Sequence, residues 1–379
     1  MSPRIAIAKS RVYRGGVFQV VAHIVEICNE LGVVPDIVTM RSDLAAKDVE
    51  RNYGENVRLN FRKVLPNLRL PYEWHFLYFN VLARPVLRKY DLIINSSNTS
   101  FLSGSKNRTI SYVHYPRKER VLSQSRDLHI PEGPAKSPLD IRRDPFFLAR
   151  MLYRSDRGSY RGETVVANSL FTRSAVLRNY LLDESDVSVV YPPVEVPRAV
   201  GSSDKCSNLV STLGRFSPEK RQLEQIEIAS RLPDLQFSVM GFTGNSRYFQ
   251  ACVDVVRSRG IANVTLLPDL SYSEAQGILR ASTYFLHSVR NEPFGITSVQ
   301  AIAAGAIPIV HDSGGQREIV PIGSLRYATI DQAVRLLDQL SKEPARHEEL
   351  RRGLVANAQN FSSAAFKARM KPMIERFLS

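Results

Sequence analysis

Cysteine is scarce in this sequence, and long apolar runs are missing. The three cysteines, Cys28, Cys206 and Cys252, are odd in number, far apart, and belong to no Cys-x-x-Cys pair. This spacing argues against a disulfide framework and a cysteine zinc site, and it fits a reducing compartment. No segment approaches the roughly 18 consecutive apolar residues of a membrane span, and residues 1–30 lack the pattern of a signal peptide. We therefore expect a cytoplasmic protein, attached at most peripherally to the cytosolic face of a membrane.

Several signatures of cofactor and metal chemistry are missing as well. No Gly-x-Gly-x-x-Gly follows the first expected strand, no Walker loop occurs, and no Asp-x-Asp at a strand end or His/Cys pattern offers metal ligands. Aromatic RNA-binding signatures and a helix-turn-helix pattern do not stand out either. We therefore expect no metal and no bound cofactor, and we do not expect nucleic acid as a partner.

The sequence does carry an excess of positive charge. It has 51 Lys and Arg against 37 Asp and Glu, a formal net charge of +14. The region 106–161 is especially basic, and aromatic residues such as Phe146 and Phe147 lie between its arginines. Such a surface can face nucleic acid, anionic lipid or a phosphorylated substrate. A generally solvated basic surface is an equally good interpretation.

Short β-branched segments alternate with helical patterns along the chain, which at 379 residues suits two domains. In the first half we expect strands at 5–8, 35–40, 92–96, 109–114, 164–167 and 187–191, and helices at 17–31 and 171–180. In the second half we expect strands at 209–213, 236–240, 263–267, 284–287 and 307–311, and helices at 219–229, 248–259, 272–280, 296–304, 330–340, 344–359 and 364–377. This order predicts an α/β fold of two Rossmann-like doubly wound domains.

The boundary between the two domains is expected in the polar segment 195–204, which is rich in Pro, Gly and Ser. This gives an N-terminal domain over 1–196, a second domain over 205–360 and a C-terminal helix in 361–379. Open α/β sheets bind ligands beyond the carboxyl ends of their strands. Functional residues are therefore expected on strand-to-helix loops that face a cleft between the domains.

The most informative loop is Glu292-Pro-Phe-Gly295, before a helix rich in small residues. Glu292 offers a carboxylate to paired sugar hydroxyls. A helix N-terminus has unpaired N–H groups, so the amides of Phe294 and Gly295 can meet sugar hydroxyls or a diphosphate. If the helix is continuous, Gln300 lies roughly 12 Å further along, and one element would grip both ends of a nucleotide-sugar donor. An ordinary helix N-terminus with an acidic first turn is the alternative.

A second candidate is the segment 213–221, which places two cations beside a glycine turn. The following helix is expected to begin with Ser217 as N-cap and Pro218 at its first position. Arg215, a planar fork, and Lys220, a mobile point charge, suit a diphosphate leaving group. Surface cations beside an ordinary capped helix are the alternative.

These segments resemble the family-4 retaining glycosyltransferases of the GT-B fold. The stretch from Glu292 to Gln300 is similar to the E-x7-E region of that family, and residues 303–320 resemble its mannosyltransferases of the dolichol-linked oligosaccharide pathway. The second family glutamate, which binds ribose hydroxyls, is Gln300 here. An amide can donate and accept hydrogen bonds but cannot act as a charged acceptor.

Two N-terminal segments extend the resemblance. Gly15 and Gly16 resemble the glycine loop of the family, where the backbone approaches the donor phosphate or the acceptor. His114 resembles the family histidine that contacts the donor sugar near the reacting carbon. Structural interpretations remain open for both, because Gly-Gly serves any tight turn and a histidine at a strand end is usually structural.

The resemblance implies metal-independent transfer of a hexose with retention, with mannose from GDP-mannose favoured over a UDP-sugar. The acceptor would be a lipid-linked or other glycan, and the departing phosphate would help to remove its proton in a front-face attack. The residues implied in catalysis are Glu292, His114, Arg215 and Lys220. Those implied in donor binding are Gly15, Gly16, Arg215, Lys220, Glu292, Phe294, Gly295 and Gln300.

The resemblance also implies that the C-terminal helix crosses back to the N-terminal domain, and that the basic region 106–161 faces the acceptor and an anionic membrane surface. Two other enzyme classes remain open, a nucleotide-sugar epimerase and a glycogen-phosphorylase-like enzyme. A catalytically weak or inactive GT-B subunit that acts as a binding scaffold is the non-enzyme alternative, and Gln300 is its one sequence hint.

Overall fold

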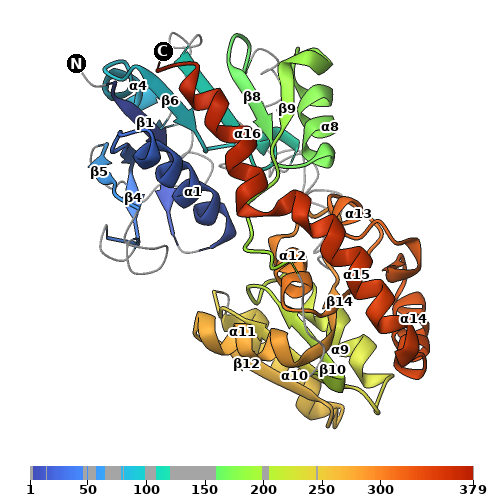
Figure 1. Ribbon diagram of the computed structural model, residues 1–379. Coiled ribbons are helices and arrows are strands. Elements are labelled where there is room, and N and C mark those ends of the chain that lie inside the picture. The colour runs from blue at the N-terminus through green and yellow to red at the C-terminus, as the bar shows by residue number, and fades with distance from the viewer. Residues whose placement is uncertain are drawn as a thin grey trace, which may run out of the picture. The chain divides into compact units, whose positions relative to one another are not determined.

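The computed structural model describes residues 3–13, 15–45, 49, 57–64, 78–79, 81–98, 108–119, 159–198, 205–244 and 246–378. The chain forms two compact units (Figure 1). The first unit comprises Met1–Pro193 and Phe366–Ser379, and the second unit comprises Val194–Ala365. The segment expected as a linker lies partly outside the described residues, and the domain bounds expected from the sequence stay predictions.

A seven-stranded parallel sheet forms the centre of the first unit, in the order β5-β3-β1-β6-β7-β8-β9. Its strands are β1 (Ile5–Ala8), β3 (Asp36–Thr39), β5 (Asn60–Lys63), β6 (Leu92–Asn95), β7 (Thr109–Val113), β8 (Thr164–Ala167) and β9 (Val187–Val189). A separate pair is formed by β2 (Arg11–Val12) and β4 (Arg41–Ser42). The strand order reverses between β1 and β6, which makes the carboxyl ends of these two strands the switch point where open sheets bind ligands.

The central strand β1 is buried on both faces. Ile5 and Ile7 point into one apolar cluster, whereas Ala6 and Ala8 point into another on the opposite face, as the two-residue period of a strand requires. A continuous apolar strand of this kind is typical of parallel sheets that helices cover on both sides. The described helices of the unit are α1 (Gly16–Glu30), α4 (Arg84–Leu87), α8 (Leu170–Asn179) and α16 (Ser363–Glu375).

Helix α16 begins in the second unit and completes the core of the first. Its Phe366, Met370 and Ile374 are buried in the same cluster as the apolar face of α1, and Figure 1 shows the two helices in the first unit. Lys367 Nζ lies 2.6 Å from Glu26 and 2.9 Å from Glu30 of α1. The apolar contacts and these ion pairs attach the C-terminal segment to the first unit.

The second unit contains a six-stranded parallel sheet in the order β12-β11-β10-β13-β14-β15. Its strands are β10 (Cys206–Leu213), β11 (Gln236–Gly241), β12 (Val264–Pro268), β13 (Ser282–His287), β14 (Ile307–His311) and β15 (Arg326–Tyr327). Its helices are α9 (Gln222–Ser230), α10 (Ser246–Ser258), α11 (Tyr272–Ala281), α12 (Ile296–Ala303), α13 (Gln316–Ile319), α14 (Ile330–Lys342) and α15 (His347–Ala358). The order reverses between β10 and β13, so the second unit has its own switch point.

Two parallel sheets with alternating helices confirm the predicted pair of doubly wound domains. One element differs in detail, since the single helix expected over 219–229 is divided. A short 3₁₀ turn, Pro218–Lys220, ends at Arg221, whose φ of 58° interrupts the helical backbone, and α9 begins after it. Ser217 makes no capping hydrogen bond with its side chain; its hydroxyl donates to the Arg215 carbonyl at 3.3 Å. Ser217 is thus the N-cap residue of this turn with Pro218 directly after it, as expected, although its side chain makes no capping bond.

Candidate functional site

Glu292 lies on the loop between β13 and α12, where it pairs with Lys220. Lys220 Nζ is 2.7 Å from Glu292 Oε2, and the two side chains are 29% and 17% exposed. Lys220 comes from the loop after β10, so the pair joins the two strand ends that flank the switch point of the second unit. The sequence predicted both residues, and the structure brings them into direct contact.

A pair of glycines after β14 holds the backbone of the Glu292 loop. The Gly315 amide donates to the Glu292 carbonyl at 2.8 Å. A Cβ on Gly314 would lie 2.5 Å from the Glu292 carbonyl oxygen, and a Cβ on Gly315 would lie 2.4 Å from the Pro293 carbonyl oxygen. Both distances are too short for any side chain, so the close approach requires glycine at each position.

Gly295 is required for two reasons that the sequence did not reveal. It adopts a φ of 112°, a backbone conformation that L-residues rarely take. A Cβ there would lie 2.0 Å from Nε2 of Gln316, whose side chain is fully buried. On this side, therefore, the backbone of Gly295 is covered by the protein itself. Phe294 also turns inward, since it is buried and packs edge-on against Phe361.

His287, the last residue of β13, is buried next to the Lys220–Glu292 ion pair. It is 5% exposed, and its Nε2 is 3.3 Å from Gln316 Nε2 and 3.9 Å from Glu292 Oε2. Burial lowers the pKa of His287 from its ordinary 6.5 to about 4, although Glu292 acts in the opposite direction. A neutral imidazole nitrogen can accept from the Gln316 amide. Within the described residues, His287 Nδ1 and Gln316 Oε1 have no hydrogen-bond partner.

The cations of the 213–221 segment take different partners. Arg215 pairs with Glu219 at 2.7 Å, and both side chains are about half exposed. Arg221, which was not predicted as a site residue, lies 2.7 Å from Glu224. Glu224 is also 3.7 Å from Arg290 of the Glu292 loop. Four cationic side chains and three carboxylates thus lie near the carboxyl ends of β10 and β13, and the small excess of positive charge suits an anionic ligand.

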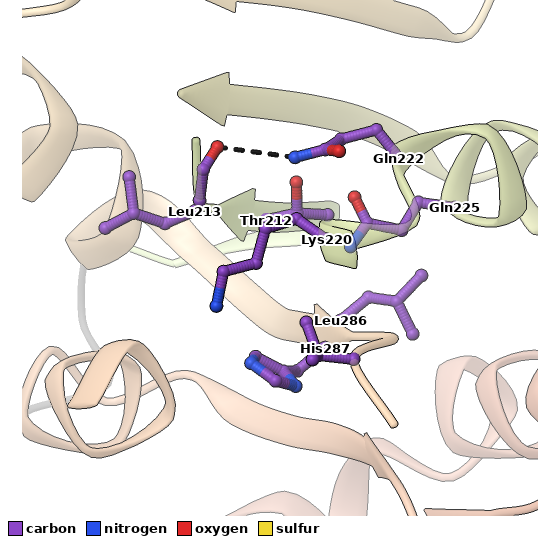
Figure 2. A pocket seen from close by; sticks show the side chains of 9 residues that line it. Thr212, Leu213, Lys220, Gln222, Gln225, Leu286 and His287 are labelled. Carbon is purple, nitrogen blue, oxygen red and sulfur yellow. Dashed lines mark hydrogen bonds between the residues drawn. The ribbon is translucent and has the colours of Figure 1, made fainter. Parts of the chain in front are cut away.

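A small recess opens between these strand ends, and Figure 2 shows Lys220 and His287 extending into it. Its lining residues are Thr212, Leu213, Gly214, Lys220, Gln222, Gln225, Leu286, His287 and Val289.

Sequence reasoning missed His287 and Gln316, because a single histidine or glutamine carries no pattern that distinguishes it from a structural residue.

Gln300 occupies the fifth position of α12 and is partly buried. The helix begins only at Ile296, so the backbone from Glu292 to Gly295 is not helical. The separation of roughly 12 Å that a continuous helix would give between Glu292 and Gln300 therefore does not apply. A contact of Gln300 with a donor ribose stays a prediction.

In the first unit, His114 directly follows β7, and hydrogen bonds fix both its side chain and its backbone. Its Nε2 lies 2.9 Å from Ser96 Oγ, and its backbone amide donates to Asn98 Oδ1 at 2.8 Å. Burial, with the nearby charge of Lys9, lowers the pKa of His114 well below its ordinary value. The imidazole is therefore neutral and fixed at the carboxyl edge of the sheet. Its predicted contact with a donor sugar stays a prediction.

Gly15 and Gly16 form the turn into α1, as predicted. Gly15 has a φ of 154° and a ψ of 174°, a combination that is essentially restricted to glycine. No side chain caps the helix and no acidic residue lies in its first turn.

The neighbouring Arg14 and most of the basic region 106–161 lie outside the described residues. In the described part of the chain, no group of His, Cys, Asp and Glu could hold a metal, and no helix is long and apolar enough to cross a membrane.

Comparison with known families identifies the class of protein to which this fold belongs. The model of "Glycosyltransferase Family 4" matches residues 14–198, and the model of "Glycosyl transferases group 1" matches residues 195–361. The chain belongs to the glycosyltransferases of the GT-B fold. The structure of Anabaena Alr3699/HepE in complex with UDP-glucose agrees with this fold, with a TM-score of 0.71 over 99% of this chain and 100% of that chain at 15% identity.

The curated relatives include several mannosyltransferases and a glycogen synthase, "Glycogen synthase 2" from Geobacter sulfurreducens, which is 32% identical over 30% of this chain and 23% of that protein. A GDP-Man:Man(3)GlcNAc(2)-PP-Dol alpha-1,2-mannosyltransferase from Yarrowia lipolytica is 25% identical over 232 residues, which cover 55% of this chain and 36% of the relative. The human protein of the same name is 25% identical over 300 residues, which cover 70% of this chain and 60% of the relative. The chain thus spans about half the length of the curated relatives it matches.

Proposed function

We propose that this chain is a retaining mannosyltransferase that moves mannose from GDP-mannose to a lipid-linked or other glycan acceptor. The observation that supports the proposal best is the Lys220–Glu292 pair at 2.7 Å, at the switch point of a sheet in a glycosyltransferase fold. A carboxylate for sugar hydroxyls and an ammonium for phosphate are the two groups that a nucleotide-sugar donor needs next to its scissile bond.

The chemical requirement of the reaction is stabilisation of a departing diphosphate. Lys220 and Arg215 would neutralise its charge, each exchanging part of its contact with a carboxylate for a phosphate oxygen. Glu292 would then be released to accept hydrogen bonds from the sugar and to orient the anomeric carbon. No residue is assigned as a base, because the departing phosphate itself can take the acceptor proton in a front-face attack.

The choice of mannose and guanosine rests on the relatives. The names of the Yarrowia and human relatives specify GDP-Man as donor and a PP-Dol-linked glycan as acceptor. The Anabaena structure contains UDP-glucose, but at 15% identity it supports the fold alone. We therefore favour GDP-mannose over a UDP-sugar, with no metal or further cofactor.

Incubation with GDP-mannose, GDP-glucose, UDP-glucose or ADP-glucose and a dolichyl-diphosphate-linked oligosaccharide tests the proposal. We expect transfer from GDP-mannose, and an α-linked product by NMR, since the donor itself carries an α-linkage. Glu292→Ala should abolish transfer while the far-UV circular dichroism spectrum is unchanged. Transfer from a UDP-sugar alone would overturn the donor assignment, and a β-linked product would overturn retention. A chain that binds GDP-mannose but transfers to no acceptor would favour the scaffold alternative.

We also propose a cytoplasmic location with peripheral attachment to an anionic membrane through the basic region 106–161. The composition of that region supports the proposal, since each Lys or Arg near an anionic surface contributes about 1 kcal/mol. Flotation with vesicles tests it. Binding should require anionic lipid and weaken as the salt concentration is raised. If the protein binds neutral vesicles as strongly as anionic ones, the proposed attachment is wrong.

A further inference from the structure

The switch point of the first unit contains a buried lysine that none of the predicted roles uses. Lys9 directly follows β1, and its Nζ donates to the carbonyl of Ser96, which directly follows β6, at 2.7 Å. These are the two strands between which the sheet order reverses. Lys9 therefore bridges the position at which open α/β sheets bind their ligands.

Among the residues that the structure describes, none places a negative charge beside Lys9. Its residue is 8% exposed, and within the described residues it has no ion pair and one hydrogen bond, to a neutral carbonyl. An ammonium group has three donors, so the described residues leave most of its capacity unused. Burial lowers the pKa of Lys9 from 10.5 to about 7, the expected response of a buried cation without a counter-charge.

The groups beside Lys9 are polar and uncharged. Ser96 links it to His114, because the Ser96 hydroxyl lies 2.9 Å from His114 Nε2. His114 is itself 7% exposed, and it is neutral, so it adds no charge that would compete with the lysine. A cation and an imidazole are thus fixed together at the carboxyl ends of β1, β6 and β7.

We propose that Lys9 binds a phosphate group of the substrate at the switch point of the first unit, where the anion supplies the counter-charge that the described residues do not. This inference rests on the proposed function, which supplies two sources of phosphate: the diphosphate of the nucleotide sugar and that of a lipid-linked acceptor. Both present the same chemistry to an ammonium group.

Lys205, a partly buried lysine, shows what a structural role looks like in this protein. Lys205 precedes β10, at the amino end of the sheet of the second unit, and its Nζ donates to Ser282 O at 2.9 Å and Ala304 O at 2.7 Å. Burial lowers its pKa to about 8. It thus joins two segments of the second unit at the amino ends of the strands, opposite the carboxyl ends where open α/β sheets bind their ligands, and it serves as the control for Lys9.

Substitution of each lysine by methionine, which has a similar length and no charge, tests the inference. Isothermal titration calorimetry measures the affinity for GDP-mannose and for a short-chain prenyl diphosphate. We expect Lys9→Met to weaken the binding of at least one ligand by about 10-fold or more, and Lys205→Met to change neither. Loss with GDP-mannose identifies the donor phosphate, and loss with the prenyl diphosphate identifies the acceptor phosphate. Unchanged affinity for both ligands overturns the inference.

A measurement on the unsubstituted protein provides a second test that does not depend on a variant's folding. A bound phosphate raises the pKa of Lys9, so binding at pH 8 should take up protons, and the uptake should decrease toward pH 6 where Lys9 is already charged. The diphosphate of GDP-mannose has no titrating group in this range, and neighbouring His114 stays neutral. Calorimetry in two buffers of different ionisation enthalpy measures the uptake. If GDP-mannose and the prenyl diphosphate both bind without proton uptake at pH 8, the inference is wrong.

The two proposals fail separately. If Glu292→Ala abolishes mannose transfer while Lys9→Met binds both ligands normally, the proposed function stands and the role of Lys9 is wrong. If the chain transfers no hexose, the proposed function is wrong, and the binding of the two diphosphates still tests Lys9.

Discussion

Lys220 Nζ and Glu292 Oε2 lie 2.7 Å apart, although 72 positions separate the two residues in sequence. Each side chain is less than one third exposed, so neither partner is well hydrated, and removal of either one would leave a partly buried charge without its partner. The contact fixes the Glu292 carboxylate where β10 and β13 end. If Lys220 binds a donor phosphate as proposed, donor binding must redistribute its bonds between a carboxylate and a phosphate.

This relationship predicts strong coupling between the two residues. We expect Glu292→Gln and Lys220→Met each to reduce transfer by about 10²- to 10³-fold, as the loss of one preorganised group at a developing charge does elsewhere. In a double-mutant cycle of urea unfolding, the coupling energy should be about 1 kcal/mol or more, since each single variant leaves a partly buried group without its partner.

The Lys342–Asp338 pair of α14 is the control for that cycle. It has a similar distance of 2.8 Å, but its side chains are 70% and 48% exposed. An exposed pair four residues apart on a helix contributes only about 0.3 to 0.5 kcal/mol. A coupling energy for Lys220 and Glu292 no larger than the one measured at Lys342 and Asp338 would show that the buried contact has no special strength.

The second prediction concerns Gly295. We expect Gly295→Ala to lower the free energy of unfolding by about 2 to 5 kcal/mol, because the new Cβ meets Gln316 and the φ of 112° is strained for alanine. Donor affinity should fall with it, since the loop that carries Glu292 must shift. Adding Gln316→Ala should restore part of the stability, because it removes the collision but leaves the backbone strain.

Gly277 provides the matched control. It lies inside α11, and a Cβ there would have no heavy atom within 4 Å. Gly277→Ala should therefore raise the free energy of unfolding by about 0.5 to 1 kcal/mol through helix propensity alone. Equal effects of the two alanines in chemical denaturation would mean that Gly295 is not constrained by its neighbours.

The sequence predicted most elements of this fold, because buried parallel strands and amphipathic helices each have a strong periodic signal. It did not predict β5, whose Asn60-Phe-Arg-Lys63 sequence is polar and lies at the edge of the sheet. It also placed one unbroken helix over 219–229, because the left-handed Arg221 carries none of the Gly or Pro signals that mark a break.

The candidate site was predictable to the extent that it depends on local motifs. Glu292 and Lys220 could be identified from the residues around them, but their contact depends on two loops that only the sheet brings together. His287 and Gln316 could not be identified, because their importance comes from burial beside Glu292 and Gly295. Lys9 was missed for the same reason, since a buried lysine and an exposed one look alike in a sequence.

Gln300 makes the third prediction. It is partly buried in α12 and replaces the glutamate of the resembling family. If its side chain contacts the donor ribose, Gln300→Glu should tighten GDP-mannose binding by about 10-fold, since a charged acceptor makes the stronger hydrogen bond. Gln300→Ala should weaken binding. Calorimetric titration of the three proteins measures the order, and identical affinities would remove Gln300 from the donor site.

His287 makes the fourth prediction, which concerns pH. Its pKa is about 4 in the folded protein and 6.5 ordinarily, so the unfolded chain binds a proton that the folded protein does not. Above pH 6.5 the imidazole is neutral in both states, so the difference in pKa does not affect the free energy of unfolding. As the pH decreases from 6.5 toward 4, the unfolded chain takes up the proton and the free energy of unfolding decreases. Between pH 7 and pH 5 this one group should lower the free energy of unfolding by roughly 2 kcal/mol.

Urea unfolding of the wild type and of His287→Asn at pH 7, 6 and 5 measures this contribution. Asparagine keeps a polar group beside Gln316 but has no titration, so the variant should lose less stability than the wild type over this range. A residual dependence is expected, because burial also lowers the pKa values of His114 and His311. Each of these histidines also binds a proton more readily in the unfolded chain, so each lowers the free energy of unfolding as the pH decreases. If the wild type and the variant lose stability in parallel, His287 is protonated in the folded protein, and the neutral imidazole behind Glu292 is wrong.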